Sequence, residues 1–285
     1  MMATFGAGPV GVCLPVTFTS TPSADDQRTA VRRLERAGYH AAWTNEVIGK
    51  DALAQLAVLL GATESLAFGT CVANIWARPP QTAHAAASFL SQAFPGRFTL
   101  GLGVGYPQQA SNVDRPFGTP LATMRSYVEG LAAEASPPAP DAPYPLILGA
   151  NGPKMLTLAA DLADGALPAG LPPQHTALAR RVLGPDKLLV VAQSIADSFE
   201  TARQTVSNWL GRTAFRATLA DLGYPTEPTD DLVRTLVAFD GPDHVAAAVQ
   251  AHLDAGADHV TLLSPVGTEF GPGIDHLVSL APALR

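Results

Sequence analysis

Long apolar runs, basic tracts and cysteines are all scarce in this 285-residue sequence. No uninterrupted apolar run approaches the roughly 18 residues that cross a membrane. Lys and Arg together number 18 against 25 Asp and Glu, and the resulting net charge of −7 disfavours nucleic acid and anionic membranes as partners. The first residues show neither the charged region nor the apolar segment of a signal peptide. We therefore expect a soluble, cytoplasmic protein that acts on a small molecule.

The cysteine and histidine patterns exclude several kinds of site. Two cysteines, Cys13 and Cys71, are too few for a disulfide framework and fit a reducing compartment. They form no CxxC pair, and the seven histidines show no HExxH or comparable spacing, so we expect no metal site. The sequence also lacks a G-x-S-x-G segment, which argues against the catalytic triad of an α/β-hydrolase.

What the chain does contain is apolar segments of strand length that alternate with helical segments. Hydrophobic residues make up 47% of the sequence, enough for one core in a single domain covering residues 1–285. Strands are predicted at residues 10–16, 39–44, 66–73, 97–104, 146–150, 165–168, 187–193 and 256–263, with helices between them that include 177–183 and 230–239. Five prolines within residues 135–145 predict an extended loop inside this domain. About eight strands predict either a (β/α)₈ barrel or a doubly wound open sheet, which periodicity alone does not distinguish.

Polar residues follow the second predicted strand. Asn45 and Glu46 come directly after it, and in a barrel this position lies at the face that carries active sites. Glu46 could equally be a solvated loop acid. Arg78, next to two prolines, is expected to pair with a loop carboxylate rather than to clamp an anion.

Two glycine-containing segments invite a binding hypothesis. In residues 101–106 the position of the third glycine of a dinucleotide fingerprint holds Tyr106, so the segment does not predict a Rossmann site. Close packing inside a barrel explains Gly101 and Gly103. Residues 149–153 link a strand to a helix with small residues and a proline at the first helical position. Bare backbone N–H groups and the helix dipole favour an anion there, although an ordinary strand–helix turn is the alternative.

Four phrases of the sequence together resemble the luciferase-like monooxygenase superfamily, and within it the coenzyme F420-dependent oxidoreductases. They are LAFGTCVANIWARPP, FPGRFTLGLGVG, LGANGPKMLTLAADLADGALP and HLDAGADHVTLL. The resemblance extends from residue 10 to about residue 281. It implies a TIM barrel, the (β/α)₈ barrel of the bacterial-luciferase-like type, and so chooses between the two architectures left open above.

The resemblance also implies roles at the end of the third strand. The family carries there a bulge with a cis peptide between non-proline residues, which supports the back of the deazaflavin ring. In this sequence the bond would join Cys71 to Val72, with Ala73 and Asn74 completing the bulge.

Further roles follow for residues on the neighbouring strands. By resemblance, Asn45 would touch the polar edge of the ring and Glu46 would lie near the reacting carbon. Gly149, Ala150, Asn151, Gly152 and Pro153 match the family's backbone cradle for the F420 phosphate.

The chain departs from the family after the fourth strand. Many members place an acid or a histidine there, whereas this chain has Gly105, counted with the cofactor-binding residues, and then Tyr106. Tyr106 and Glu46 are therefore the two candidates for the catalytic proton donor.

We expect hydride transfer between F420 and a small organic substrate. An FMN-dependent monooxygenase on the same barrel, and a cofactor-binding barrel without activity, stay open as alternatives. By resemblance, the chain is also expected to form a homodimer through the helices at 51–63 and 79–94.

Overall fold

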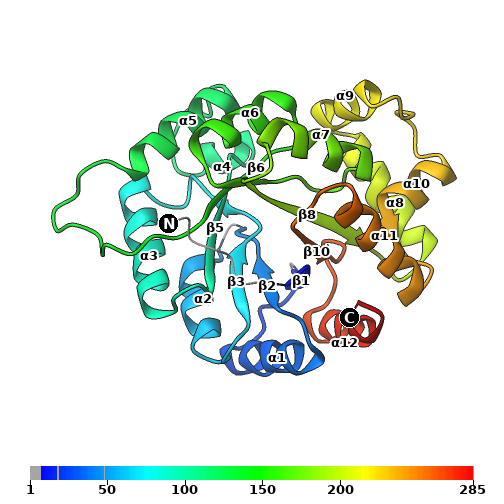
Figure 1. Cartoon of the computed structure of the whole chain (residues 1–285), viewed down its shortest axis with the longest axis horizontal. Helices are drawn as coiled ribbons and strands as arrows, with labels where there is room; N and C mark the ends of the chain where they lie inside the picture. Colours follow the sequence, from blue (N-terminus) through cyan, green and yellow to red (C-terminus); the bar gives the residue numbers. More distant parts are fainter. Residues whose placement is uncertain (1–7, 18, 48, 285) are drawn as a thin grey trace.

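Parallel strands close into a barrel in the computed structural model, which describes residues 8–17, 19–47 and 49–284 (Figure 1). Within these residues, eight strands follow one another around the barrel: β1 (Val10–Cys13), β2 (Ala41–Thr44), β3 (Ala67–Thr70), β5 (Phe98–Gly103), β6 (Leu146–Gly149), β7 (Gly165–Leu167), β8 (Leu188–Ile195) and β10 (His259–Leu263). β10 pairs with both β8 and β1, which closes the sheet. The predicted (β/α)₈ barrel is confirmed.

Two short strands lie beside the barrel strands. β4 (Ala73–Asn74) resumes after β3 and pairs with the end of β5. β9 (Val237–Ala238) pairs with Ser194 and Ile195 at the end of β8. The prediction of a helix over 230–239 is therefore wrong at its end, because the backbone of residues 237–238 bonds to β8 instead of continuing the helix.

Helices surround the barrel (Figure 1). They are α1 (Ala24–Ala37), α2 (Ala52–Leu60), α3 (Pro80–Ala93), α4 (Pro107–Ser111), α5 (Pro120–Leu131), α6 (Pro153–Leu162), α7 (Pro173–Leu183), α8 (Phe199–Leu210), α9 (Thr213–Asp221), α10 (Asp230–Leu236), α11 (Pro242–Asp254) and α12 (Phe270–Leu280), with a 3₁₀ turn η1 (Ala281–Leu284). α4 was not predicted. α7 begins earlier than the predicted residue 177, because a proline is favourable at the first helical position. None of these helices, within the described residues, is long and apolar enough to cross a membrane.

Local sequence explains where the helices begin and end. At the start of α1, Ser23 and Asp26 form the two reciprocal hydrogen bonds of a capping box. The same helix ends at Gly38, whose φ of 98° lies in the left-handed region that favours glycine. Helix α6 begins with Pro153 at its first position, as predicted.

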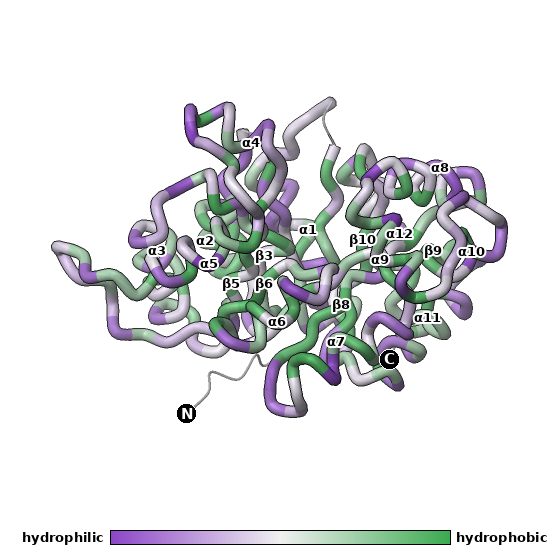
Figure 2. The backbone as a smooth tube through the Cα atoms, turned by 90° about the horizontal axis from the view of Figure 1, so that it is seen from above, coloured by the Kyte–Doolittle hydropathy of each residue, from purple (hydrophilic) through white to green (hydrophobic). Residues whose placement is uncertain are grey.

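The apolar residues form separate clusters. The barrel interior holds Trp43, Ile147 and Val190, all buried. Gly69 leaves room for this tryptophan, because a Cβ there would lie 2.3 Å from the Trp43 ring. A larger cluster fills the space between the strands and the outer helices, and another joins α8, α9 and α10. Hydrophobic segments accordingly run through the centre of the molecule in Figure 2.

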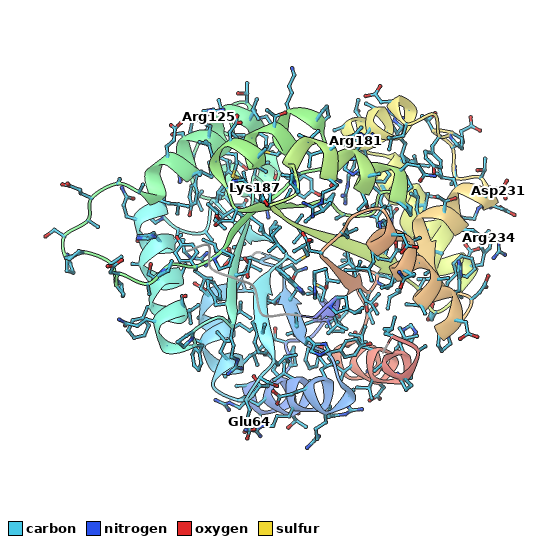
Figure 3. The ribbon with its side chains drawn as sticks, viewed as in Figure 1. Glu64, Arg125, Arg181, Lys187, Asp231 and Arg234 are labelled. Carbon is cyan, nitrogen blue, oxygen red and sulfur yellow. The ribbon has the colours of Figure 1, made fainter. Side chains whose placement is uncertain are left out.

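Many charged side chains lie on the outside. Figure 3 shows Glu64, Arg125, Arg181, Asp231 and Arg234 along the outer edge of the ring of helices. Buried charged side chains are instead found near the ends of the barrel strands, where Glu46 and Arg78 lie.

Candidate active site

The predicted site residues lie on consecutive strands of the barrel. β2, β3, β5 and β6 are neighbours in that order. Because parallel strands end at the same edge of a barrel, the segments that follow them lie along one rim: residues 45–46, 71–74, 105–106 and 149–153. Figure 2 shows α4, which follows β5, projecting from the barrel at this rim. The structure thus brings all four predicted segments to the same end of the barrel.

The bulge between β3 and β4 contains the predicted cis peptide bond, between Cys71 and Val72. The backbone N–H of Cys71 donates to the carbonyl of Thr44 at 2.7 Å, and the N–H of Glu46 donates to the carbonyl of Val72 at 3.1 Å. These two bonds tie the bulge to the end of β2.

Val72 packs between two glycines of the neighbouring strands. A Cβ on Gly103 would lie 2.2 Å from Val72 Cγ2, and one on Gly149 would lie 3.4 Å from Val72 Cγ1. Gly103 therefore serves close packing, as predicted. The side chain of Val72 thereby also links the bulge after β3 to the end of β6.

Glu46 is the most heavily bonded side chain of this rim. Its side chain is only 2% exposed, so the idea of a solvated loop acid is wrong. One oxygen accepts from the backbone N–H of Ala52 at 2.9 Å, and the other accepts from the N–H of Asn74 at 2.7 Å. Both oxygens also accept from the guanidinium of Arg78. These contacts occupy both carboxylate oxygens. A role of Glu46 in proton transfer stays a prediction.

Arg78 forms ion pairs with two carboxylates, in agreement with the expectation that it pairs with a loop carboxylate. It bonds to Glu46 and lies 3.1 Å from Asp51, and its own side chain is 10% exposed. Burial opposes the charged form of Arg78, but the hydrogen bonds and charges of the two carboxylates outweigh it and raise the pKa of the guanidinium. The charge pair therefore braces the end of β2, the bulge and the start of α2.

A lysine and two thiols complete the interior of this rim, and the sequence did not indicate that they meet. Lys50 Nζ donates to Thr44 Oγ1 at 2.7 Å and to Asn45 Oδ1 at 3.3 Å. Burial lowers the pKa of Lys50. Cys13 is buried beside Cys71, and a hydrogen bond to the Cys13 thiol together with burial raises the pKa of Cys71. The available signal was that Cys13 ends β1 and Cys71 directly follows β3.

Tyr106 follows β5 in the sequence, whereas the bulge precedes it, and Tyr106 is exposed to solvent. The residue is 54% exposed, and its backbone N–H donates to Gln109 Oε1 at 2.8 Å. Gly105 adopts a φ of +64°, and a Cβ there would lie 2.1 Å from that same oxygen. The guanidinium of Arg212, at the start of α9, lies 5.5 Å from the Tyr106 ring centre. This contact joins the segment after β5 to the helices after β8.

The turn after β6 has the features of an anion site. Gly152 is the N-cap of α6 and has no side chain with which to cap the N–H groups of the first turn. A Cβ on Gly152 would meet none of the described atoms within 4 Å. Asn151 exchanges two hydrogen bonds with the backbone of Ala169, at 3.1 and 2.9 Å, which fix the turn. An open turn at the N-terminus of a helix, fixed by hydrogen bonds of Asn151, fits a phosphate group.

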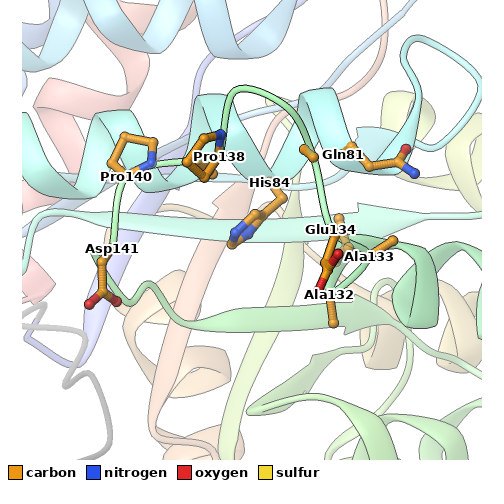
Figure 4. Close-up of a pocket in the computed structure, with 11 residues that line it drawn as sticks. Gln81, His84, Ala132, Ala133, Glu134, Pro138, Pro140 and Asp141 are labelled. Atoms are coloured by element: carbon orange, nitrogen blue, oxygen red, sulfur yellow. The ribbon is translucent and has the colours of Figure 1, made fainter.

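Two cavities of the described chain lie outside the barrel. One, of about 270 Å³, lies between α3 and residues 131–141, and His84 and Glu134 line it (Figure 4). The other, of about 390 Å³, lies between the first turns of α1 and α12. Neither includes a predicted site residue, and no group of three or more His, Cys, Asp and Glu among the described residues could hold a metal ion.

The family model described as luciferase-like monooxygenase matches residues 9–183, more than half of the chain. This chain belongs to the luciferase-like monooxygenase family. The match includes β1 to α7 and therefore every predicted site residue of this family member.

Curated relatives of this luciferase-like protein are named as oxidoreductases or reductases, and one of them carries F420 in its name. A putative coenzyme F420-dependent oxidoreductase of Mycobacterium tuberculosis is 32% identical over 170 residues, which cover 48% of this chain and 49% of that protein. The 5,10-methylenetetrahydromethanopterin reductase of Archaeoglobus fulgidus is 27% identical over 189 residues, covering 60% and 56%. The chain spans about half the length of the curated relatives it matches.

Solved structures share the fold. An F420-dependent secondary alcohol dehydrogenase, in complex with an F420–acetone adduct, superposes with a TM-score of 0.73. The superposition covers 98% of this chain and 99% of the other at 15% sequence identity. At this identity the likeness shows the luciferase-like barrel alone.

Proposed function

We propose that this luciferase-like protein is an F420-dependent oxidoreductase that transfers a hydride between the deazaflavin and a small organic substrate. The observation that carries the proposal is that the bulge lies beside the strand end from which the proposed anion turn starts. Val72 of the bulge lies beside Gly149, the last residue of β6, directly before the open turn. A support for a flat ring and a cradle for an anionic tail are therefore adjacent on one rim, which suits a cofactor that has both parts. The name of the Mycobacterium tuberculosis relative supports F420 as this cofactor.

The residues of the rim divide the binding task between them. We assign Cys71, Val72, Ala73 and Asn74 to the support of one ring face. Asn45, held by Lys50, would meet the polar edge of the ring. When bound, the deazaflavin supplies the hydride chemistry.

The remaining assignments concern the tail and the open side of the ring. The turn from Gly149 through Ala150 and Asn151 to Gly152 and Pro153 would hold the phosphate. Gly105 allows the left-handed backbone conformation, with a φ of 64°, that precedes Tyr106.

We further propose that Tyr106 handles the proton directly. Its exposure at the rim leaves its hydroxyl accessible to a substrate. Glu46 would act through its hold on Asn74 and thereby on the bulge, because both carboxylate oxygens already accept bonds from the protein. The active site would then combine one proton donor with one positioning carboxylate.

A substrate panel tests this function. The purified protein is mixed with oxidised or reduced F420 and a broad set of small alcohols, ketones and unsaturated compounds. The 420-nm absorbance of the deazaflavin and dissolved oxygen are recorded together. We expect a substrate-dependent change of absorbance without oxygen uptake.

A second candidate is an FMN-dependent monooxygenase, which the description of the family favours. It would consume oxygen in the same assay when supplied with reduced FMN. Binding of F420 without turnover across the whole panel would instead indicate the third alternative, a catalytically silent barrel.

We also propose a homodimer formed through α2 and α3. Phe89 on α3 is 62% exposed and Val58 on α2 is 37% exposed, so these helices offer apolar side chains to a partner.

We expect Phe89→Glu to convert a dimer to a monomer, because a buried unpaired carboxylate opposes association. The molar mass is measured by light scattering after size exclusion. Val182→Glu, on α7 and also 37% exposed, is the matched control that should stay dimeric. A monomeric parent protein would contradict the proposal.

A further inference from the structure

A buried histidine lies directly behind the predicted phosphate turn. His175, in the first turn of α7, is 2% exposed, and its Nε2 lies 2.7 Å from the carbonyl oxygen of Asn151. A carbonyl oxygen only accepts hydrogen bonds, so Nε2 must carry the proton of this bond. The ring therefore acts as a donor to the backbone of the turn.

The other ring nitrogen of His175 lacks a partner in the part of the chain that the structure describes. Nδ1 is buried and makes no hydrogen bond with any described residue. Burial lowers the pKa of His175, which favours the neutral ring with Nδ1 as an unpaired acceptor. An unpaired buried polar atom costs free energy, and an apolar side chain would fill the same space without that cost. The bond to Asn151 is the contact that explains a histidine here.

This bond controls the direction of the next N–H group. The carbonyl of Asn151 and the N–H of Gly152 belong to one planar trans peptide, so they point to opposite sides. Because His175 holds the oxygen, the N–H of Gly152 points away from His175, and the space where a Cβ of Gly152 would lie is open among the described atoms. Hydrogen bonding at the oxygen also polarises the peptide and strengthens the N–H as a donor. The Asn151 side chain fixes the same peptide from another direction, through Ala169.

We propose that His175 is a positioning residue, which orients the Asn151–Gly152 peptide so that its N–H meets the anionic tail of the cofactor. This inference rests on the proposed binding of F420. It adds a residue that makes no direct contact with the ligand and lies 22 residues beyond the predicted turn.

The test compares two probes that differ in the tail. One is F420, and the other is the same deazaflavin chromophore on a ribityl chain without the phosphate-bearing tail. Dissociation constants are measured by fluorescence titration. We expect His175→Leu to weaken F420 binding by roughly tenfold, because the freed carbonyl turns towards water and takes the N–H with it. Affinity for the tail-less chromophore should stay within about twofold of the parent, because this probe makes no contact with the turn.

Conservative variants separate positioning from packing. His175→Gln keeps a donor at about the reach of Nε2 and should restore most of the F420 affinity. His175→Asn has the same amide on a shorter side chain, so it should bind F420 as weakly as the Leu variant, and it replaces that variant if leucine prevents folding. His252→Leu is the control, because this neighbouring histidine is 1% exposed and bonds to Thr176 and Gln193 instead of the turn. It should change neither affinity.

Several results would overturn the inference. They are an equal loss for both probes in the Leu or Asn variant, no loss for F420, or a Gln variant as weak as the Asn variant. If the parent protein binds the tail-less chromophore and F420 equally well, the turn holds no phosphate and the inference fails while deazaflavin binding stands. If the parent binds neither probe, the proposed function itself is wrong.

Discussion

Replacement of Glu46 by alanine is expected to lower the free energy of unfolding by about 3–5 kcal/mol. The substitution leaves Arg78 almost fully buried with only the partly exposed Asp51 as a charge partner. It also leaves the N–H groups of Ala52 and Asn74 without their acceptor. The loss is measured as the change in unfolding free energy from urea titrations followed by circular dichroism.

An exposed ion pair provides the comparison. Asp230→Ala removes the pair with Arg203, whose side chains are 69% and 42% exposed, and should cost less than about 1 kcal/mol. The double variant Glu46→Leu, Arg78→Met should recover part of the loss, since it removes both buried charges together. If Glu46→Ala costs no more than Asp230→Ala, the carboxylate does not brace the rim.

Tyr106→Phe is expected to lower kcat by about 10²- to 10⁴-fold, the usual contribution of a positioned acid or base. The substitution removes only the hydroxyl. The ring can keep its contact with Arg212, and the backbone N–H keeps its bond to Gln109. F420 affinity should therefore be nearly unchanged, and steady-state kinetics together with fluorescence titration separate the two effects.

Two companion variants complete the kinetic test. Glu46→Gln keeps the shape of the side chain but removes its charge, and combined with Tyr106→Phe it should abolish turnover while F420 still binds. Tyr224→Phe is the control, because this tyrosine packs against the cluster of α8 to α10 and should retain full activity. Parental rates in both Tyr106→Phe and Glu46→Gln would show that the proton is handled elsewhere.

The sequence predicted the alternation of strands and helices but not the closure of the sheet. Closure depends on the pairing of β10 with β1 and β8, which joins residues such as Val10 and Val260 from opposite ends of the chain. Hydrophobic periodicity reports only local structure, so it left an open sheet as an alternative. The resemblance to a family supplied the missing information. The short helix at 230–236 shows the same limit, because pairing with β8 determines where it ends.

The sequence predicted the site residues that lie at the ends of strands. It did not predict which residues contact them in the folded chain. The ends of strands identified Asn45, Glu46 and the turn at 149–153. The partners were not visible, because Arg78 lies 32 residues after Glu46 and His175 lies 24 residues after Asn151. Burial decides whether such residues act as solvated groups or as braces, and burial is a property of the folded chain.

The central claim is that the rim formed by the bulge and the glycine turn binds a deazaflavin. The most direct measurement is a fluorescence titration of F420 and, separately, of FMN with the purified protein. We expect saturable quenching of F420 at one site per chain and a much weaker response of FMN. Saturable quenching of FMN without any response of F420 would contradict the account.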